Sequence, residues 1–364
     1  VFLPQIVILF AFLAILEDCG YMARAAYLMD RIMSKAGLNG KSFIPLLSSV
    51  ACAVPGIMAA RVIENRRDRL ATILVAPLMS CSARLPVYSL LVGAFLTEGY
   101  AFWVPGVAFF GLYMIGLTLA PLVAFALKRT LLKGDTPAFV MEMPLYKIPS
   151  PMTVVRRSLE AGWMFLRRAG TMILASMIVI WALLYFPATA PDGESFEDKI
   201  ARLEAMDEPP GDEINALNQQ WKAQSILGHM GKAIEPVVRP LGWDWRIGMA
   251  ALASFPAREV IVGVLGIIFG EGEIDSKEEN SVTQLGDRLR TVEDDEGHGR
   301  KIFSVPVALS VMVFFALCAQ CVSTLAVIRR ETNSWGWPLF TFVYMTALAY
   351  IGALMTFQVG RLFL

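Results

Sequence analysis

Four of the five cysteines lie in or beside apolar segments that carry helix-breaking residues: Cys52, Cys81, Cys318 and Cys321. Cys52 precedes Pro55 by three residues, and a proline inside a helix removes a backbone hydrogen bond and exposes carbonyl oxygens. A thiolate is a soft ligand that suits transition metals, and nearby carbonyl oxygens could add to its coordination. A lone cysteine in an apolar helix is more often a small packing residue, and we keep that interpretation for Cys19. The recurrence predicts that at least two of the other four contact a metal ion.

Ionisable residues also lie inside apolar segments, where they usually face a cavity or a partner. Glu259 could supply a hard oxygen ligand that complements the thiols, or it could form an internal lock with Arg258. Arg84 is expected to pair with an acid or to shape a gate, because a cation does not bind a metal ion. We therefore assign gating or structural roles to Pro55, Pro256, Arg84 and Arg258.

Two adjacent acids, Glu17 and Asp18, end the first apolar segment. They could neutralise Arg24, or they could interact with the positive end of the helix that follows them. We assign them a structural or gating role.

The pair Cys318 and Cys321 has the spacing of zinc and redox motifs, and on a helix both thiols would fall on one face. A structural zinc site would need two further ligands, and the two histidines, His229 and His298, lie in polar segments. A redox role would need an exposed thiolate. Neither role is favoured over transient metal contact.

Motifs of enzymes are absent from the 364 residues. Gly40-Lys41-Ser42 resembles the end of a phosphate-binding loop, but Lys35 stands where that loop requires a glycine. We expect no catalytic residue, no bound cofactor and no enzymatic activity in this chain.

The composition is that of a polytopic membrane protein. Hydrophobic residues make up 56% of the chain, charged residues 18%, and the mean hydropathy is +0.55. The net charge is zero, which gives no reason to expect nucleic acid as a partner. The cysteines do not form the disulfide framework of a secreted protein.

Apolar stretches of spanning or near-spanning length predict an all-α fold. They fall at about 2–16, 42–60, 71–96, 101–127, 169–189, 247–270, 303–328 and 337–360. Two of them, 42–60 and 247–270, carry strong internal breakers. Basic residues place 128–168 in the cytoplasm, and acidic residues place the start of 190–246 outside, with an amphipathic helix over 214–240.

The two halves of the chain resemble each other with opposite orientation. The loop charges make 42–60 a re-entrant segment from the cytoplasm and 247–270 one from outside. Each is followed by a span that carries cysteine. Paired interrupted helices in inverted repeats are typical of secondary transporters.

Several motifs resemble the membrane domain of ferrous iron transport protein B, the FeoB family. They stand in order along nearly the whole chain, in the segments 16–31, 40–45, 52–61, 76–88, 167–171, 231–236, 241–245, 257–260 and 325–332. The resemblance implies uptake of ferrous iron across the bacterial inner membrane, with Cys52, Cys81 and Cys318 or Cys321 contacting iron. It also implies a GTP-binding domain in cis or in trans, so we expect this chain to be a fragment or a separate membrane subunit.

The resemblance divides the chain into two inverted gate modules with interrupted or re-entrant helices. We assign 1–128 to the first gate module and 129–168 to a basic cytoplasmic linker with an amphipathic helix. Residues 169–246 form a transmembrane helix and an external amphipathic segment. Residues 247–364 form the second gate module, with an acidic insertion at 271–301.

The expected function is therefore a multi-pass permease whose transported substrate is Fe²⁺. Expected partners are membrane lipid, the GTP-binding domain, small accessory proteins of the iron system and a second copy of the chain. Two alternatives stay open. Gate modules also occur in carriers of nucleosides or other small solutes, and Cys318 with Cys321 could serve a membrane oxidoreductase.

Overall fold

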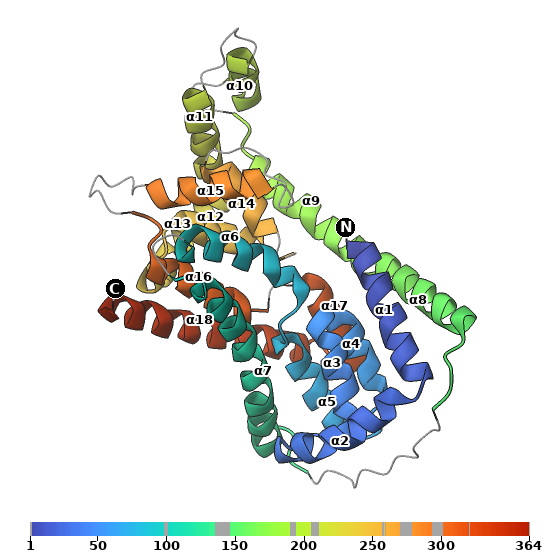
Figure 1. Ribbon diagram of the computed structural model, residues 1–364. Helices are drawn as coiled ribbons and strands as arrows, with labels where there is room; N and C mark the ends of the chain where they lie inside the picture. The colour runs from blue at the N-terminus through green and yellow to red at the C-terminus, as the bar shows by residue number, and fades with distance from the viewer. Residues whose placement is uncertain are drawn as a thin grey trace. The chain divides into compact units, whose positions relative to one another are not determined.

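The chain is built from α-helices, as Figure 1 shows for the computed structural model. The structure describes residues 2–97, 101–134, 146–189, 194–204, 211–256, 258, 260–269, 279–292, 301–319 and 321–363. Over these residues it contains helices and no β-strand. The predicted all-α polytopic fold is confirmed.

Two compact units make up the chain, and each draws on three separate stretches of sequence. Unit 1 consists of Val1–Ser82, Tyr113–Leu174 and Val322–Met345, and unit 2 consists of Ala83–Leu112, Ala175–Cys321 and Thr346–Leu364. The long helices α7 (Val104–Thr130) and α18 (Gly336–Phe363) contribute to both units.

Unit 1 gathers short helices from the first quarter of the chain around later elements. They are α1 (Phe2–Asp18), α2 (Tyr21–Lys35), α3 (Phe43–Ala51), α4 (Ala53–Ala59), α5 (Arg66–Val75), α8 (Pro151–Phe165) and α17 (Val322–Thr332), with the short turns η1 (Gly40–Ser42), η2 (Ala60–Val62) and η3 (Ala76–Leu78). Helix α1 packs against α8, and α4 packs against both α3 and α17. Elements distant in sequence therefore share one core.

Unit 2 holds the remaining helices. They are α6 (Leu85–Leu96), α9 (Thr171–Tyr185), α10 (Phe196–Glu204), α11 (Gly211–Gln224), α12 (Ile226–Val238), α13 (Trp245–Ala253), α14 (Val260–Phe269), α15 (Glu279–Thr291) and α16 (Val305–Leu317). In sequence, the turn η4 (Ser82–Arg84) spans the boundary between the two units. The π-helix η5 (Leu166–Gly170) belongs to unit 1, and α9 begins in unit 1 and continues into unit 2. Helix α15 packs along α6, and α12 packs along α13.

Four helical stretches among the described residues are long and apolar enough to cross a membrane, and they differ in burial. In Val104–Thr130 and Gly336–Leu362 only 22% of the most apolar window is buried, whereas the values are 72% for Arg66–Leu96 and 65% for Val305–Thr332. The two exposed helices present apolar side chains outward, as lipid-facing helices do. The two buried stretches are the ones that contain cysteine.

Both cysteine-containing stretches, which overlap the predicted spans 71–96 and 303–328, are interrupted. The first is broken between η3 and η4, and the second between α16 and α17. Irregular backbone at membrane depth is tolerated where protein surrounds it, which agrees with the burial of these stretches. The predicted interruption near Pro256 is present between α13 and α14.

The predicted amphipathic helix over 214–240 is two helices, α11 and α12. Ser225 separates them because its hydroxyl accepts a hydrogen bond from the Gly228 N–H at 3.0 Å and so caps the start of α12. The described part of the acidic insertion, 279–292, is also mostly helical, as α15.

Candidate functional site

The interruption in the first cysteine segment lies at Cys52 itself. Helix α3 ends there, Cys52 adopts an extended conformation with φ −153° and ψ 132°, and α4 begins at the next residue. The sequence predicted the break at Pro55, which instead lies in the first turn of α4. Proline is tolerated in a first turn because the N–H it lacks would be unpaired there anyway. Because Pro55 has no N–H, it cannot donate a helical hydrogen bond to the Ala51 carbonyl, four residues earlier.

Gly56 allows α3 and α4 to lie close together beside this break. A Cβ atom at Gly56 would stand 1.9 Å from the Ser49 Oγ and 2.7 Å from the Pro45 carbonyl oxygen. The Ser49 hydroxyl donates to that same carbonyl at 2.7 Å. Only glycine fits between these atoms, so the close pairing of the two half-helices depends on it.

Cys81 lies in the second interruption, in the irregular backbone between η3 and η4. Pro77 and Pro86 stand in the first turns of η3 and α6, which explains why no helix continues through this region. Helix α7 approaches the same backbone at Gly116, where a Cβ would lie 2.8 Å from the Ser80 Oγ. Cys81 is partly exposed.

Cys318 and Cys321 lie in the third interruption and not on a helix, which corrects the prediction that both thiols share one helix face. Helix α16 ends at Cys318, whose φ of −69° and ψ of 155° are extended. Cys318 is only 2% exposed, whereas Cys321 is partly exposed. The described residues show no disulfide between them.

Arg258 explains why α16 can end in a buried position. Its guanidinium donates to the Phe315 carbonyl at 3.2 Å and to the Cys318 carbonyl at 2.6 Å. The last carbonyls of a helix have no partner inside the helix, and a cation is favourable at this end of the helix dipole. Arg258 is itself 6% exposed, so this buried charge is compensated by backbone oxygens.

The other predicted site residues of unit 2 have different surroundings. Glu259 lies outside the described residues. Pro256 lies in the bend after α13. Arg84 is fully buried at the start of α6, as is Tyr88 one turn later, so Arg84 is an interior residue and not a surface charge.

Glu17 and Asp18 neutralise a helix end other than the one predicted. Asp18 accepts a hydrogen bond of 2.9 Å from the backbone N–H of Ser150, the N-cap of α8, and pairs with Lys147 at 3.1 Å. Glu17 pairs with Arg157 of α8 at 3.5 Å. The expectation of Arg24 or of α2 as partner is wrong, because the packing of α1 against α8 brings a distant helix terminus to these acids.

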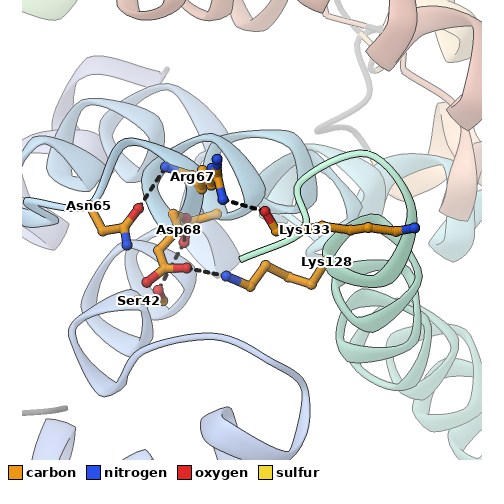
Figure 2. A network of polar contacts seen from close by, with 7 residues as sticks. Ser42, Asn65, Arg67, Asp68, Lys128 and Lys133 are labelled. Carbon is orange, nitrogen blue, oxygen red and sulfur yellow. Dashed lines mark hydrogen bonds and ion pairs between the residues drawn. The ribbon is translucent and has the colours of Figure 1, made fainter. Parts of the chain in front are cut away.

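Unit 1 contains a buried ion pair that was not predicted from the sequence. Asp68, in the first turn of α5, lies 2.5 Å from the Nζ of Lys128, in the last turn of α7 (Figure 2). The two side chains are 0% and 7% exposed. Each charge has the sign that its helix end favours. The sequence feature that could have indicated this pair is Asp68, the single acid among the basic residues 66–69.

Further polar contacts surround this pair. The Thr72 hydroxyl lies 2.8 Å from the Asp68 carbonyl and 2.9 Å from the Ser42 hydroxyl. Asn65 caps α5 by accepting from the Arg67 N–H at 2.9 Å, and the Arg67 side chain donates to the Lys133 carbonyl. The network therefore fixes the start of α5 to η1 and to the end of α7.

A second ion pair of unit 1 joins η2, which lies downstream of Cys52, to α17, which follows Cys321. Arg61 of η2, which directly follows α4, holds Glu331 of α17 through two hydrogen bonds of 2.7 and 2.5 Å. Nearby, the hydrogen bond that Lys41 donates at 2.9 Å holds the pKa of the Glu64 carboxyl below its ordinary value. The fork of Arg61 on one carboxylate fixes both distance and orientation.

No group of three or more His, Cys, Asp or Glu side chains gathers anywhere in the described part of the chain. What the structure offers a cation is a thiol beside the carbonyl end of a helix, at Cys52 after α3 and at Cys318 after α16. Such helix ends carry partial negative charge on carbonyl oxygens that have no partner within the helix. This chemistry suits brief contact with a soft cation better than permanent binding.

Taken together, the fold and these interruptions define a multi-pass α-helical membrane protein with broken helices, as in secondary transporters. Residues 1–95 and 166–335 match the Gate family, described as nucleoside recognition. Residues 109–160 match the C terminus of ferrous iron transport protein B. The chain belongs to the Gate family, in the form carried by the membrane domain of FeoB.

Curated relatives match over the whole chain. It is 42% identical to the Fe(2+) transporter FeoB of Leptospira interrogans and 40% identical to that of Staphylococcus aureus, and it covers 49% and 47% of their lengths. It is also 40% identical to a fusion of Fe(2+) transport protein A with FeoB from Porphyromonas gingivalis, of which it covers 43%. The chain thus spans about half the length of these relatives. No solved structure matches it significantly.

Proposed function

We propose that this chain is the membrane part of a ferrous iron transporter of the bacterial inner membrane. The relatives named Fe(2+) transporter FeoB match it from end to end, and one segment matches the C terminus of ferrous iron transport protein B. The chain itself acts as a permease and not as an enzyme. The GTP-binding domain implied by the family resemblance acts on it in cis or in trans, and the fusion in Porphyromonas gingivalis supports an accessory protein of the FeoA type as a partner.

The observation that carries the proposal is the position of the cysteines. Cys52, Cys81, Cys318 and Cys321 all lie where an apolar segment is interrupted. Cys19 lies in the turn between α1 and α2, and its thiol donates to the Leu16 carbonyl at 3.4 Å. A cysteine that only packs gains nothing from an interruption, but a ligand gains nearby carbonyl oxygens. We propose these four thiols as transient iron ligands, with Glu259 acting through its negative charge.

The proposed mechanism replaces water around the ion by a few protein ligands. A bare divalent ion cannot enter hydrocarbon, because an unpaired charge there is very costly. Carbonyl oxygens at the ends of α3 and α16 supply part of the lost hydration, and the adjacent thiols favour Fe²⁺ over the harder Mg²⁺. Each site has few ligands, which allows the ion to leave again.

Uptake by cells that express the complete system tests the role of the cysteines. We expect the double variant Cys52→Ala with Cys81→Ala to lose most uptake of radioactive Fe²⁺ at unchanged protein level. Cys19→Ala is the matched control and should behave like the parent chain. Normal uptake by the double variant would show that these thiols do not serve the ion.

A second candidate function is transport of a nucleoside, because the Gate family is described as nucleoside recognition. It predicts binding of a nucleoside such as uridine and no effect of cysteine replacement. Equilibrium binding of Fe²⁺ and of uridine to the purified chain distinguishes the two, and the thiols at the interruptions favour iron.

A further inference from the structure

We propose that the Arg258 guanidinium is a tethered cation that occupies the cation position at the Cys318 interruption and must leave it before an ion can bind. This inference rests on the proposed function, because it concerns the access of iron to one of the proposed sites. It assigns Arg258 a role as an internal competitor of the ion.

The first step of the argument is the position of the charge. The carbonyl oxygens of Phe315 and Cys318 point to one guanidinium, at 3.2 and 2.6 Å, at the end of α16. Those oxygens carry the negative end of the helix dipole. The interruption is thus a place where the protein already stabilises a positive charge.

The second step is the burial of that charge. Arg258 is 6% exposed and Cys318 is 2% exposed. A buried cation is tolerated only with compensating partners, and here backbone oxygens provide compensation. A divalent cation that lost its water at this point would need the same oxygens, and the Cys318 thiol would add a soft ligand.

The third step is the comparison with a similar helix end in the same unit. Arg290 of α15 donates to the carbonyl of Ala94 and, at 3.5 Å, to that of Gly93, in the last turn of α6. That arginine also caps a helix end, but the cap contains no cysteine. Arg290 therefore provides a matched control for capping without a thiol ligand.

The experiment measures the reactivity of Cys318 in the full chain, reconstituted in lipid vesicles. Cys19, Cys52, Cys81 and Cys321 are replaced by alanine so that a water-soluble maleimide reports on Cys318 alone. Arg258→Met should raise the labelling rate about tenfold or more, because charge-assisted hydrogen bonds that shield the helix end are lost. Arg258→Lys keeps a cation and should lie between, and Arg290→Met should leave the rate unchanged.

Protection by metal distinguishes a competitor from a simple cap. In the Arg258→Met chain, anaerobic Fe²⁺ should slow the labelling, because the ion takes the vacated position beside the thiol. In the parent background it should have little effect. Faster labelling without protection by Fe²⁺, or equal acceleration in the Arg290→Met chain, would overturn the proposal.

Two features of the experiment separate this inference from misfolding of a variant and from failure of the proposed transport function. Should Arg258→Met not fold, as judged by gel filtration, Arg258→Lys alone decides, since a competitor predicts a moderate gain in labelling that Fe²⁺ reverses and an unchanged rate contradicts it. The labelling uses no transport step. Failure of the parent chain to take up iron would therefore count against the proposed function and not against this inference.

Discussion

Gly56 illustrates how one residue permits the interruption at Cys52. Its Cα faces the Ser49 hydroxyl and the Pro45 carbonyl so closely that any Cβ would overlap both. Proline 55 contributes by fixing the first turn of α4, not by breaking a longer helix. The geometry around the Cys52 thiol therefore depends on Gly56, which has no side chain that could bind an ion.

Replacing Gly56 by alanine should therefore destabilise the chain by about 1–3 kcal/mol, as overpacking of a tight contact usually does. The thermal unfolding of the detergent-solubilised protein, followed by circular dichroism, measures the effect. Gly111→Ala in α7 is the control, because a Cβ there meets nothing within 4 Å and alanine favours a helix. Equal stability of the two variants would contradict the close packing of α3 on α4.

The sequence predicted where the chain is interrupted better than it predicted the backbone conformation at each interruption. The association of Cys52 and Cys81 with interruptions could be anticipated from the prolines beside them. The break at Cys318 could not, because its cause is Arg258, which is about sixty positions away in sequence. Likewise, the partners of Asp18, Ser150 and Lys147, lie just before α8, and no local pattern links them to α1.

At the scale of elements, two ion pairs connect helices and turns of unit 1: one is buried and the other is bidentate. The Asp68–Lys128 pair joins α5 to α7, and the second carboxylate oxygen of Asp68 is buried with no hydrogen-bond partner among the described residues. The charge of Asp68 thus depends on a single lysine. Pairs of this kind contribute little net stability but are costly to break on one side.

We expect Asp68→Asn or Lys128→Met alone to destabilise the chain by about 3–5 kcal/mol, since each leaves one buried group without its counterpart. The double variant should recover a large part of that loss. Chemical unfolding of the four chains in a double-mutant cycle measures the coupling. Glu160→Ala, which removes the exposed pair with Arg156, should leave the stability nearly unchanged. Additive effects of the Asp68 and Lys128 variants would refute the coupling.

The Arg61–Glu331 pair connects α17 to η2, the turn that follows α4. Arg61→Lys should lower iron uptake because lysine cannot form the two-point contact. Exchange of the two charges, Arg61→Glu with Glu331→Arg, should restore more uptake than Arg61→Glu alone retains. Uptake assays at matched protein level measure this, and a charge-exchanged chain no better than Arg61→Glu would exclude a direct role of the pair.

At the scale of the whole molecule, the sequence predicted the fold class and the apolar segments, because hydropathy and length determine both. Among the described residues, most of each predicted span is helical, and α7 and α18 are exposed and apolar, as lipid-facing helices should be. Hydropathy could not reveal that each unit draws on three distant stretches of chain. That grouping follows from tertiary packing, to which window averages are insensitive.

We propose that this membrane chain, with thiols at its interrupted helices, moves ferrous iron under the control of a GTP-binding domain. The most direct test is anaerobic uptake of Fe²⁺ into vesicles that contain this chain, with and without the GTP-binding domain of a FeoB relative. We predict uptake that requires the chain, increases with the GTP-binding domain and GTP, and falls strongly in the Cys52→Ala, Cys81→Ala chain. Equal uptake by vesicles with and without the chain would contradict the account.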